Sequence, residues 1–231
     1  ALPISIFEAN PIPDSARARE LAKKKEEETV EKLRENQLIA SINEILNNIK
    51  GRINAQRKSY DEVDQLVRNK EKLLSHTPAI QPVSNKDLNR IASGFGYRID
   101  PVYKTPKLHA GLDFAAPQGT PIYATADGIV SLAGNSGDGY GNHVIINHGY
   151  GYETLYGHMV RVKTVVGRSV KRGEVIGYVG STGKSTGPHC HYEVHKNGNK
   201  IDPIYFFYND LTPEQFDLIL KKAAASNQSF D

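Results

Sequence analysis

Five side chains in the second half of the chain could together bind and use a metal ion. His109 is followed four residues later by Asp113, and His189 and His191 stand two residues apart. A further histidine, His158, follows a Leu-Tyr-Gly sequence between these two motifs. Catalytic zinc usually takes three protein ligands from His, Asp and Glu and keeps a fourth position open for water or substrate. The set is therefore large enough for an open metal centre with two imidazoles to spare.

The spacing of these residues favours extended chain. Gly111 and a proline farther on disfavour a helix around the first motif, and an even separation keeps side chains on one face of a strand. By the same rule His189 and His191 point one way and Cys190 points the other. Other histidines share this parity or lie in a neighbouring predicted strand: His143, His148 and His195. Spacing alone therefore leaves several ligand sets open.

From about residue 94 to residue 203 the chain resembles the lysostaphin and LytM type of zinc endopeptidase. The first motif of that family, His-x-x-x-Asp, matches His109 and Asp113, and its later His-x-His motif matches His189 and His191. Its central histidine, in Leu-Tyr-x-His, matches His158. The resemblance implies that Zn²⁺ is bound by three residues: His109, Asp113 and His191. It implies two catalytic histidines, His158 and His189.

The activity implied by this resemblance is zinc-dependent hydrolysis of peptide cross-links or stem peptides in bacterial peptidoglycan. The zinc ion would acidify its water and polarise the scissile carbonyl, while the two catalytic histidines handle protons and the developing oxyanion. Which of the two is the general base stays open, because that depends on their tautomers. A second hypothesis is a non-enzymatic LytM-like module that activates another wall hydrolase. Such members usually lack one or more of these residues, and none is missing here.

Three other chemistries fit the sequence less well. Gly183-Lys184-Ser185 resembles the end of a phosphate loop, but the glycine required five residues earlier is Tyr178. A cysteine peptidase would use Cys190, which parity places on the strand face opposite the neighbouring histidines. The net charge is only +3, from 29 Lys plus Arg and 26 Asp plus Glu, and no basic stripe with interleaved aromatics is present. Nucleic acid is therefore not an expected partner.

The first 76 residues are expected to form a helical, coiled-coil-like arm. No proline occurs between Ala16 and Leu74, and apolar residues recur in alternating steps of three and four from Ile39 to Leu74. Gly51 lies inside this pattern and is a candidate break between two helices. A dimeric coiled coil, a helical hairpin and packing against the second domain all remain open. The arm could thus act as a spacer, a docking element or an inhibitor.

The rest of the chain is expected to be an antiparallel, mainly β catalytic domain over residues 91–231. Residues 77–90, with two prolines near their start, are the predicted linker. The strands expected from β-branched and aromatic runs between glycine turns are Ile122–Ala126, Gly128–Leu132, His143–Asn147, Tyr152–Tyr156, Val175–Val179 and His189–His195. Thr212, Pro213 and Gln215 have the pattern of a helix N-terminus, which predicts one short C-terminal helix.

The resemblance also implies a location in the bacterial cell envelope, on the periplasmic side, where peptidoglycan lies. No signal peptide or transmembrane span is visible, but the chain starts at Ala1 rather than Met, so a membrane anchor upstream of the arm is a hypothesis. The expected partners are peptidoglycan peptides and, through the arm, a second copy of the chain or an envelope protein.

Overall fold

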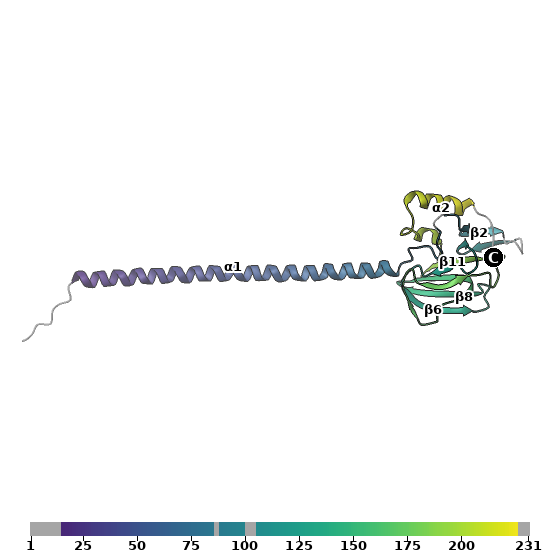
Figure 1. Ribbon diagram of the computed structural model, residues 1–231. Coiled ribbons are helices and arrows are strands. Elements are labelled where there is room, and N and C mark those ends of the chain that lie inside the picture. Colours follow the sequence, from purple (N-terminus) through teal and green to yellow (C-terminus); the bar gives the residue numbers. More distant parts are fainter. Residues whose placement is uncertain (1–14, 86–87, 100–104, 226–231) are drawn as a thin grey trace, which may run out of the picture. The chain divides into compact units, whose positions relative to one another are not determined.

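The computed structural model describes residues 15–85, 88–99 and 105–225. Contacts divide the chain into two compact units, Ala1–Leu66 and Val67–Asp231. The described part of the first unit is helical throughout and belongs to α1 (Ser15–His76). All strands and the second α-helix belong to the second unit (Figure 1). The predicted order, a helical segment followed by a β domain with a short C-terminal helix, is confirmed.

Helix α1 continues without interruption through Gly51. The candidate break at this position is therefore wrong, and so is the helical hairpin that depended on it. A glycine in a helix interior costs only about 1 kcal/mol relative to alanine, and the many Glu, Lys, Leu and Arg residues on both sides favour the helix. Residues 17–66 are all exposed, including the apolar residues of the three-four pattern. Among the described helices, none is long and apolar enough to span a membrane.

The second unit is built on one ten-stranded sheet, with its main path in the order β1-β4-β11-β8-β7-β6-β9. In chain order these strands are β1 (Ile91–Ser93), β4 (Leu112–Ala115), β6 (Gly128–Asn135), β7 (Asn142–Gly149), β8 (Tyr152–Val162), β9 (Ser169–Val170) and β11 (His189–Lys196). Off this path lie β5 (Pro121–Tyr123), β10 (Val175–Val179) and β12 (Asn199–Ile201). A separate two-stranded sheet pairs β2 (Gly96–Ile99) with β3 (Pro106–His109). The pairings are antiparallel, as predicted.

The six predicted strands correspond to β5, β6, β7, β8, β10 and β11, and several of them extend farther than predicted. Four short strands were not predicted: β1, β2, β9 and β12. Each has only two to four residues, too few for an alternating pattern to show. Their existence depends on a partner strand, which only the folded chain supplies.

The segment predicted as a linker packs against the sheet over its described residues. Ala79 and Val83 are completely buried. The Ala79 N–H donates to the Thr125 carbonyl at 3.2 Å, and the Tyr123 N–H donates to the Pro82 carbonyl at 2.8 Å. Proline stops the helix but keeps its carbonyl as an acceptor and its ring as an apolar surface. Much of this segment is therefore packed into the β domain and is not a free linker.

The C-terminal helix α2 (Pro213–Ala225) follows a short 3-10 helix, η1 (Pro203–Phe206). Its predicted capping box is present. The Thr212 N–H donates to Gln215 Oε1 at 2.9 Å, and the Gln215 N–H donates to Thr212 Oγ1 at 3.3 Å. The helix buries Ile219 in the core and packs near β1.

Strand β11 separates the core from the functional face. Cys190, Tyr192 and Val194 belong to the hydrophobic core, where the Tyr192 ring lies 5.3 Å from that of Tyr156. The side chains of the alternate residues point from the other face of the strand: His189, His191 and Glu193. Aromatic packing on one face thus holds the imidazoles in place on the other.

Candidate metal centre

Three possible metal ligands converge from three strands. His109 ends β3, Asp113 lies in β4 and His191 lies in β11, and all three are buried. Asp113 Oδ1 lies 3.1 Å from His109 Nε2 and 2.8 Å from His191 Nδ1, and the two nitrogens are 3.2 Å apart. They form one group of side chains able to hold a metal ion. The structure therefore brings together the three residues that the resemblance assigned to zinc.

The chain path around the first motif differs from the simple strand expected there. His109 and Asp113 lie in two different sheets, because the chain leaves β3 and enters β4 between them. Gly111 sits at this crossing, where an added Cβ would lie 2.3 Å from the Tyr192 carbonyl oxygen. Only glycine permits so close an approach. Asp113 then pairs directly with His191 across the β4–β11 ladder, so cross-strand register brings these two together.

Backbone and side-chain partners orient both imidazoles of this group. His109 Nδ1 lies 2.6 Å from the Gly94 carbonyl, to which its N–H can donate, leaving the Nε2 lone pair toward Asp113. His191 Nε2 lies 3.1 Å from Glu193 Oε1, and the same logic leaves its Nδ1 lone pair toward the group. Partners of this kind select the tautomer of metal-binding histidines. The two imidazoles are therefore oriented as ligands.

Asp113 is held in its ionised form. Burial by itself would raise the pKa of this carboxyl, but its interactions with His109 and His191 outweigh burial and hold the pKa well below its usual value. Arg98 adds a guanidinium nitrogen 3.7 Å from Asp113 Oδ2. A buried carboxylate needs such compensation, which a bound cation would also supply.

The donor set fits a tetrahedral transition-metal ion. Ligand bonds of about 2.0–2.1 Å place neighbouring donor atoms about 3.3 Å apart around such an ion, and the three observed separations of 2.8–3.2 Å are close to that value. Two imidazoles and one carboxylate leave one tetrahedral position open. The residues present thus fit a catalytic type of metal site in number, chemistry and spacing.

The two histidines predicted to be catalytic border the same group. The His158 and His189 rings lie 4.6 Å apart between centroids, and His189 Nε2 lies 3.8 Å from Asp113 Oδ1. His158 Nδ1 is 2.7 Å from the Thr182 carbonyl, and His189 Nδ1 is 2.8 Å from the Gly187 carbonyl. Carbonyls that accept from Nδ1–H place the proton-accepting lone pair of each neutral ring on Nε2. Both rings thus have the tautomer needed to exchange a proton there.

A bulge in β8 aims His158 at the site. This residue has φ of 59°, in the left-handed region that non-glycine residues rarely occupy. The β7–β8 register shifts here, from Val144 opposite Tyr156 to Asn142 opposite Met159. Bulges re-aim side chains near functional sites, and backbone strain of about 1–3 kcal/mol persists only where the surroundings impose it. The His158 N–H donating to the Tyr140 carbonyl at 2.8 Å is one such restraint.

Two glycine-containing loops meet to hold the carbonyl that orients His158. A Cβ on Gly183 would lie 2.4 Å from the Gly139 oxygen and the Gly141 nitrogen, so the loops touch through their backbones. Thr182 is tied down by its hydroxyl, which donates to the Met159 carbonyl at 2.9 Å and accepts from the Asn142 N–H at 3.0 Å. Glycine at positions 141 and 183 permits this close backbone contact, which a larger residue would block.

The three histidines left open by spacing lie outside the ligand group. His148 contacts the Asp127 carbonyl and Thr154, and burial lowers its pKa to about 4. His143 contacts the Gly141 carbonyl, and His195 contacts Glu193. The thiol of Cys190 is buried in the core, and burial raises its pKa, which makes it unsuitable as a nucleophile.

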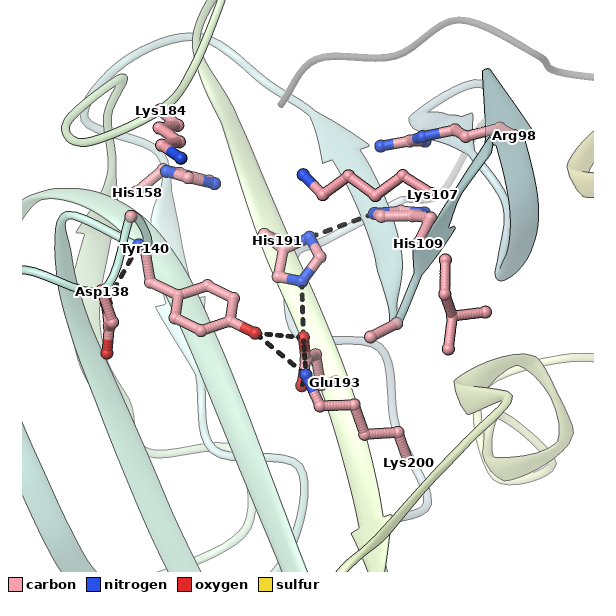
Figure 2. Close-up of a pocket in the computed structure, with 13 residues that line it drawn as sticks. Arg98, Lys107, His109, Asp138, Tyr140, His158, Lys184, His191, Glu193 and Lys200 are labelled. Atoms are coloured by element: carbon pink, nitrogen blue, oxygen red, sulfur yellow. Dashed lines mark hydrogen bonds and ion pairs between the residues drawn. The ribbon is translucent and has the colours of Figure 1, made fainter. Parts of the chain in front are cut away.

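Glu193 is a residue of this site that the sequence analysis missed. Its carboxylate accepts from Tyr140 Oη at 2.7 Å and lies 3.1 Å from Lys200 Nζ and 3.1 Å from His191 Nε2 (Figure 2). It also lies 2.6 Å from His195 Nε2. Burial would raise the pKa of Glu193, but these partners outweigh it and lower the pKa. Its position two residues after His191, on the same strand face, is the signal that could have revealed it.

We expect Glu193→Gln to weaken metal binding by about 10- to 100-fold, the usual effect of changing such a partner of a metal-binding histidine. The amide keeps the shape of the side chain but removes the negative charge that accepts from His191. Competition with a chromogenic chelator measures the affinity. Glu153→Gln, in the neighbouring strand and outside the pocket, is the matched control. Equal affinities of the two variants would contradict the role given to Glu193.

Comparisons with known proteins agree with this site. The sequence profile described as peptidase family M23 matches residues 107–203. The DD-carboxypeptidase/endopeptidase Mpg of Neisseria meningitidis serogroup B is 54% identical over 115 residues, which are 50% of this chain and 26% of that protein. The peptidoglycan DD-endopeptidase ShyA of Vibrio cholerae serotype O1 is 43% identical over 116 residues, 50% of this chain and 27% of that protein.

The chain is also similar to a solved structure. The catalytic domain of the antimicrobial peptidase lysostaphin from Staphylococcus simulans has 35% identity and a TM-score of 0.46, covering 54% of this chain and 97% of that chain. The chain spans about a quarter of the length of the curated relatives it matches. The five predicted site residues, which are the four of the two motifs and the central histidine, all lie inside the matched region. Through residues 107–203 the chain therefore belongs to peptidase family M23.

Proposed function

We propose that this protein is a zinc-dependent endopeptidase that hydrolyses peptide cross-links or stem peptides of bacterial peptidoglycan. The observation that carries the proposal is the buried group of His109, Asp113 and His191, with two further imidazoles beside it. The match to peptidase family M23 and the activities for which Mpg and ShyA are named support the same reaction and substrate. A peptidoglycan substrate implies that the protein is located in the cell envelope, and we propose that it lies in the periplasm.

The proposed roles follow from what each side chain can do. His109, Asp113 and His191 hold Zn²⁺, which when bound supplies a Lewis acid and an acidified water. His158 and His189 present Nε2 toward the reacting atoms, where one removes a proton and the other donates to the developing oxyanion or leaving group. The rigid strand β11 and the loop carbonyls hold these rings in place before substrate arrives. Such preorganisation lowers the cost of reaching the transition state.

We propose that residues 91–231 form the peptidase domain and residues 1–76 the arm, and that residues 77–90 connect the two while packing on the domain through Ala79 and Val83. Peptide hydrolysis then depends on a metal bound by the domain alone. Removing the metal by dialysis against a chelator should abolish release of peptide fragments from purified peptidoglycan, and one equivalent of Zn²⁺ per chain should restore it. Fragments are measured by chromatography and mass spectrometry. Metal-loaded protein that releases no fragments from any wall type would instead favour a binding module.

We propose further that the arm self-associates as a coiled coil. Its apolar stripe is exposed along the helix, with Ile42 46% and Ile49 44% exposed. Sustained steps of three and four are the pattern that two helices bury against each other, and a continuous exposed apolar stripe marks an interaction surface.

Replacing Ile42 and Ile49 together with lysine in the full chain should weaken self-association at least 100-fold, because two like charges then face their copies in the seam. Sedimentation equilibrium measures the change. Asn47→Lys with Asn54→Lys adds the same charge outside the seam and serves as the control. A wild-type chain that stays monomeric at high concentration would refute self-association and leave an envelope protein as the partner.

A further inference from the structure

A second row of apolar side chains runs along α1 beside the stripe described above. The stripe occupies positions a and d of a heptad repeat, with Ile39 at a and Ile42 at d. The second row falls at position g, one residue before each a. From its start to its end it holds two apolar, two polar and again two apolar residues: Leu38, Ile45, Arg52, Ser59, Leu66 and Leu73. All six are exposed, so the described part of the chain leaves this row open to a partner.

The other flank of the stripe is polar throughout. Position e, one residue after each d, carries Asn43, Lys50, Arg57, Asp64 and Glu71. In a two-stranded coiled coil, positions e and g lie on opposite sides of the a–d seam and set the orientation of the helices. In a parallel pair each g residue faces an e residue of the other helix. In an antiparallel pair g faces g, and e faces e. The orientation therefore decides whether the apolar g residues meet apolar or charged ones.

A parallel pair would bring poorly matched side chains together. Ile45 would face Lys50 of the second copy, and Leu66 would face Glu71. Arg52 would face Arg57, so that two like charges meet on each side of the dimer. At position d, Lys70 would lie opposite its own copy inside the seam, where the burial of charge is costly. The charge pattern therefore disfavours this orientation.

An antiparallel pair matches the g row with itself. The row has the same order of apolar and polar residues from either end, so a reversed copy is complementary to it. Each pair then occurs twice in the dimer: Leu38 with Leu73, Ile45 with Leu66, and Arg52 with Ser59. One like-charge contact, between Lys50 and Arg57, remains on the e side, where water and salt weaken it.

The same register also suits the polar residues of the seam. Each a residue then lies opposite a d residue, so Lys70 meets Ile39 and is kept apart from its own copy. Its alkyl stem can cover Ile39 while the ammonium group reaches water. Gln56 lies opposite Ile53, and its amide donates to the Tyr60 hydroxyl in its own helix at 3.0 Å. This amide therefore keeps a hydrogen-bond partner when the seam closes.

We infer that α1 pairs with a second copy of itself in the antiparallel orientation, with Leu38 of one copy beside Leu73 of the other. This inference rests on the self-association proposed above and assigns it a contact surface and a register. One side of the seam buries the apolar g row, and the other side leaves the charged e row in water. The C-terminal ends of the two helices then lie at opposite ends of the paired segment.

Disulfide formation tests the orientation directly, because two cysteines join only when their Cα atoms lie within about 7 Å. Leu46→Cys and Val63→Cys are made in separate full-length chains with different tags and are equilibrated together in a glutathione buffer. These positions are an a and a d residue that face each other only in the antiparallel register. Cys190 is buried in the core and stays out of the exchange. We expect the disulfide between unlike chains to exceed either disulfide between like chains about tenfold.

The matched control for the register replaces one of the two chains. Leu46→Cys is mixed with Lys70→Cys, whose position meets residue 46 only if the helices slip by one heptad. This mixture should form little disulfide between unlike chains. A mixed disulfide as abundant as that of the first pair would overturn the register.

Charge substitutions in the g row give effects of opposite sign in the two orientations. In the antiparallel pair Ile45→Glu and Leu66→Lys each remove an apolar contact on both sides of the dimer and should weaken association about tenfold. The two together restore about threefold, because the introduced charges then face each other. In a parallel pair the introduced carboxylate would face Lys50 and the introduced ammonium would face Glu71, so each single variant would strengthen association. Sedimentation equilibrium measures all three.

Disulfides mainly between like chains, or tighter association of either single variant, would overturn the antiparallel pair. A wild-type chain that dimerises while the first cysteine pair forms no disulfide also overturns it, and self-association then stands without this orientation. A monomeric wild-type chain removes self-association itself, with an envelope protein left as the partner of the arm. Fragment release from peptidoglycan is measured separately on the wild-type protein, so the proposed hydrolysis is tested independently of the arm.

Discussion

His109→Ala should lose its zinc and, with it, peptidoglycan hydrolysis. The substitution removes one of three protein donors and leaves Asp113 with one imidazole fewer to offset its burial. Binding free energies of about 10–16 kcal/mol are shared among the ligands of a protein zinc site, so one ligand accounts for roughly three orders of magnitude in affinity. Zinc per chain after dialysis, measured by atomic absorption, and fragment release give the two readouts.

The control for this prediction is His76→Ala. His76 ends α1 and contacts the Lys72 carbonyl, away from the three ligands. It should bind one zinc per chain and keep full activity. If His109→Ala retained zinc as tightly as the control, the ligand set would be wrong. Circular dichroism of both variants shows whether the β domain is folded without the metal.

His189→Ala should keep zinc and still lose most of its activity. Its Nε2 lies 3.8 Å from Asp113 Oδ1, and it lies outside the group of three donors, so metal affinity should be little changed. Loss of a positioned acid–base or oxyanion group costs about 10²–10⁴ in rate. The matched measurement is kcat on one purified cross-linked fragment, with zinc content determined on the same sample.

His158→Ala is the partner experiment, because the two rings lie 4.6 Å apart and have equivalent carbonyl contacts. It should also retain zinc and lose activity. The pH–rate profiles of the two variants then distinguish their roles, since loss of the general base removes the acidic limb of the profile. Zinc loss in either variant would move that histidine into the ligand set.

Local patterns predicted much of the fold. Alternation and glycine turns predicted the longer strands, and Thr212 with Gln215 predicted the start of α2, because these signals depend on neighbours in the chain. The helix break predicted at Gly51 was wrong, because a single helix-weakening residue is outweighed by the helix formers around it. The packing of Ala79 and Val83 was also not foreseen, because proline marks the end of a helix but says nothing about where the next segment is buried.

At the site, the residue types and their spacing predicted a metal centre, and strand parity predicted that Cys190 and His191 face opposite ways. Parity left His143, His148 and His195 as alternatives, and only the resemblance chose among them. The tertiary structure decided which atoms meet: the β4–β11 register placed Asp113 opposite His191, and the crossing at Gly111 brought His109 in from another sheet. Ligand geometry depends on contacts between residues up to 82 positions apart. Such contacts arise from strand pairing and core packing, which no local pattern encodes.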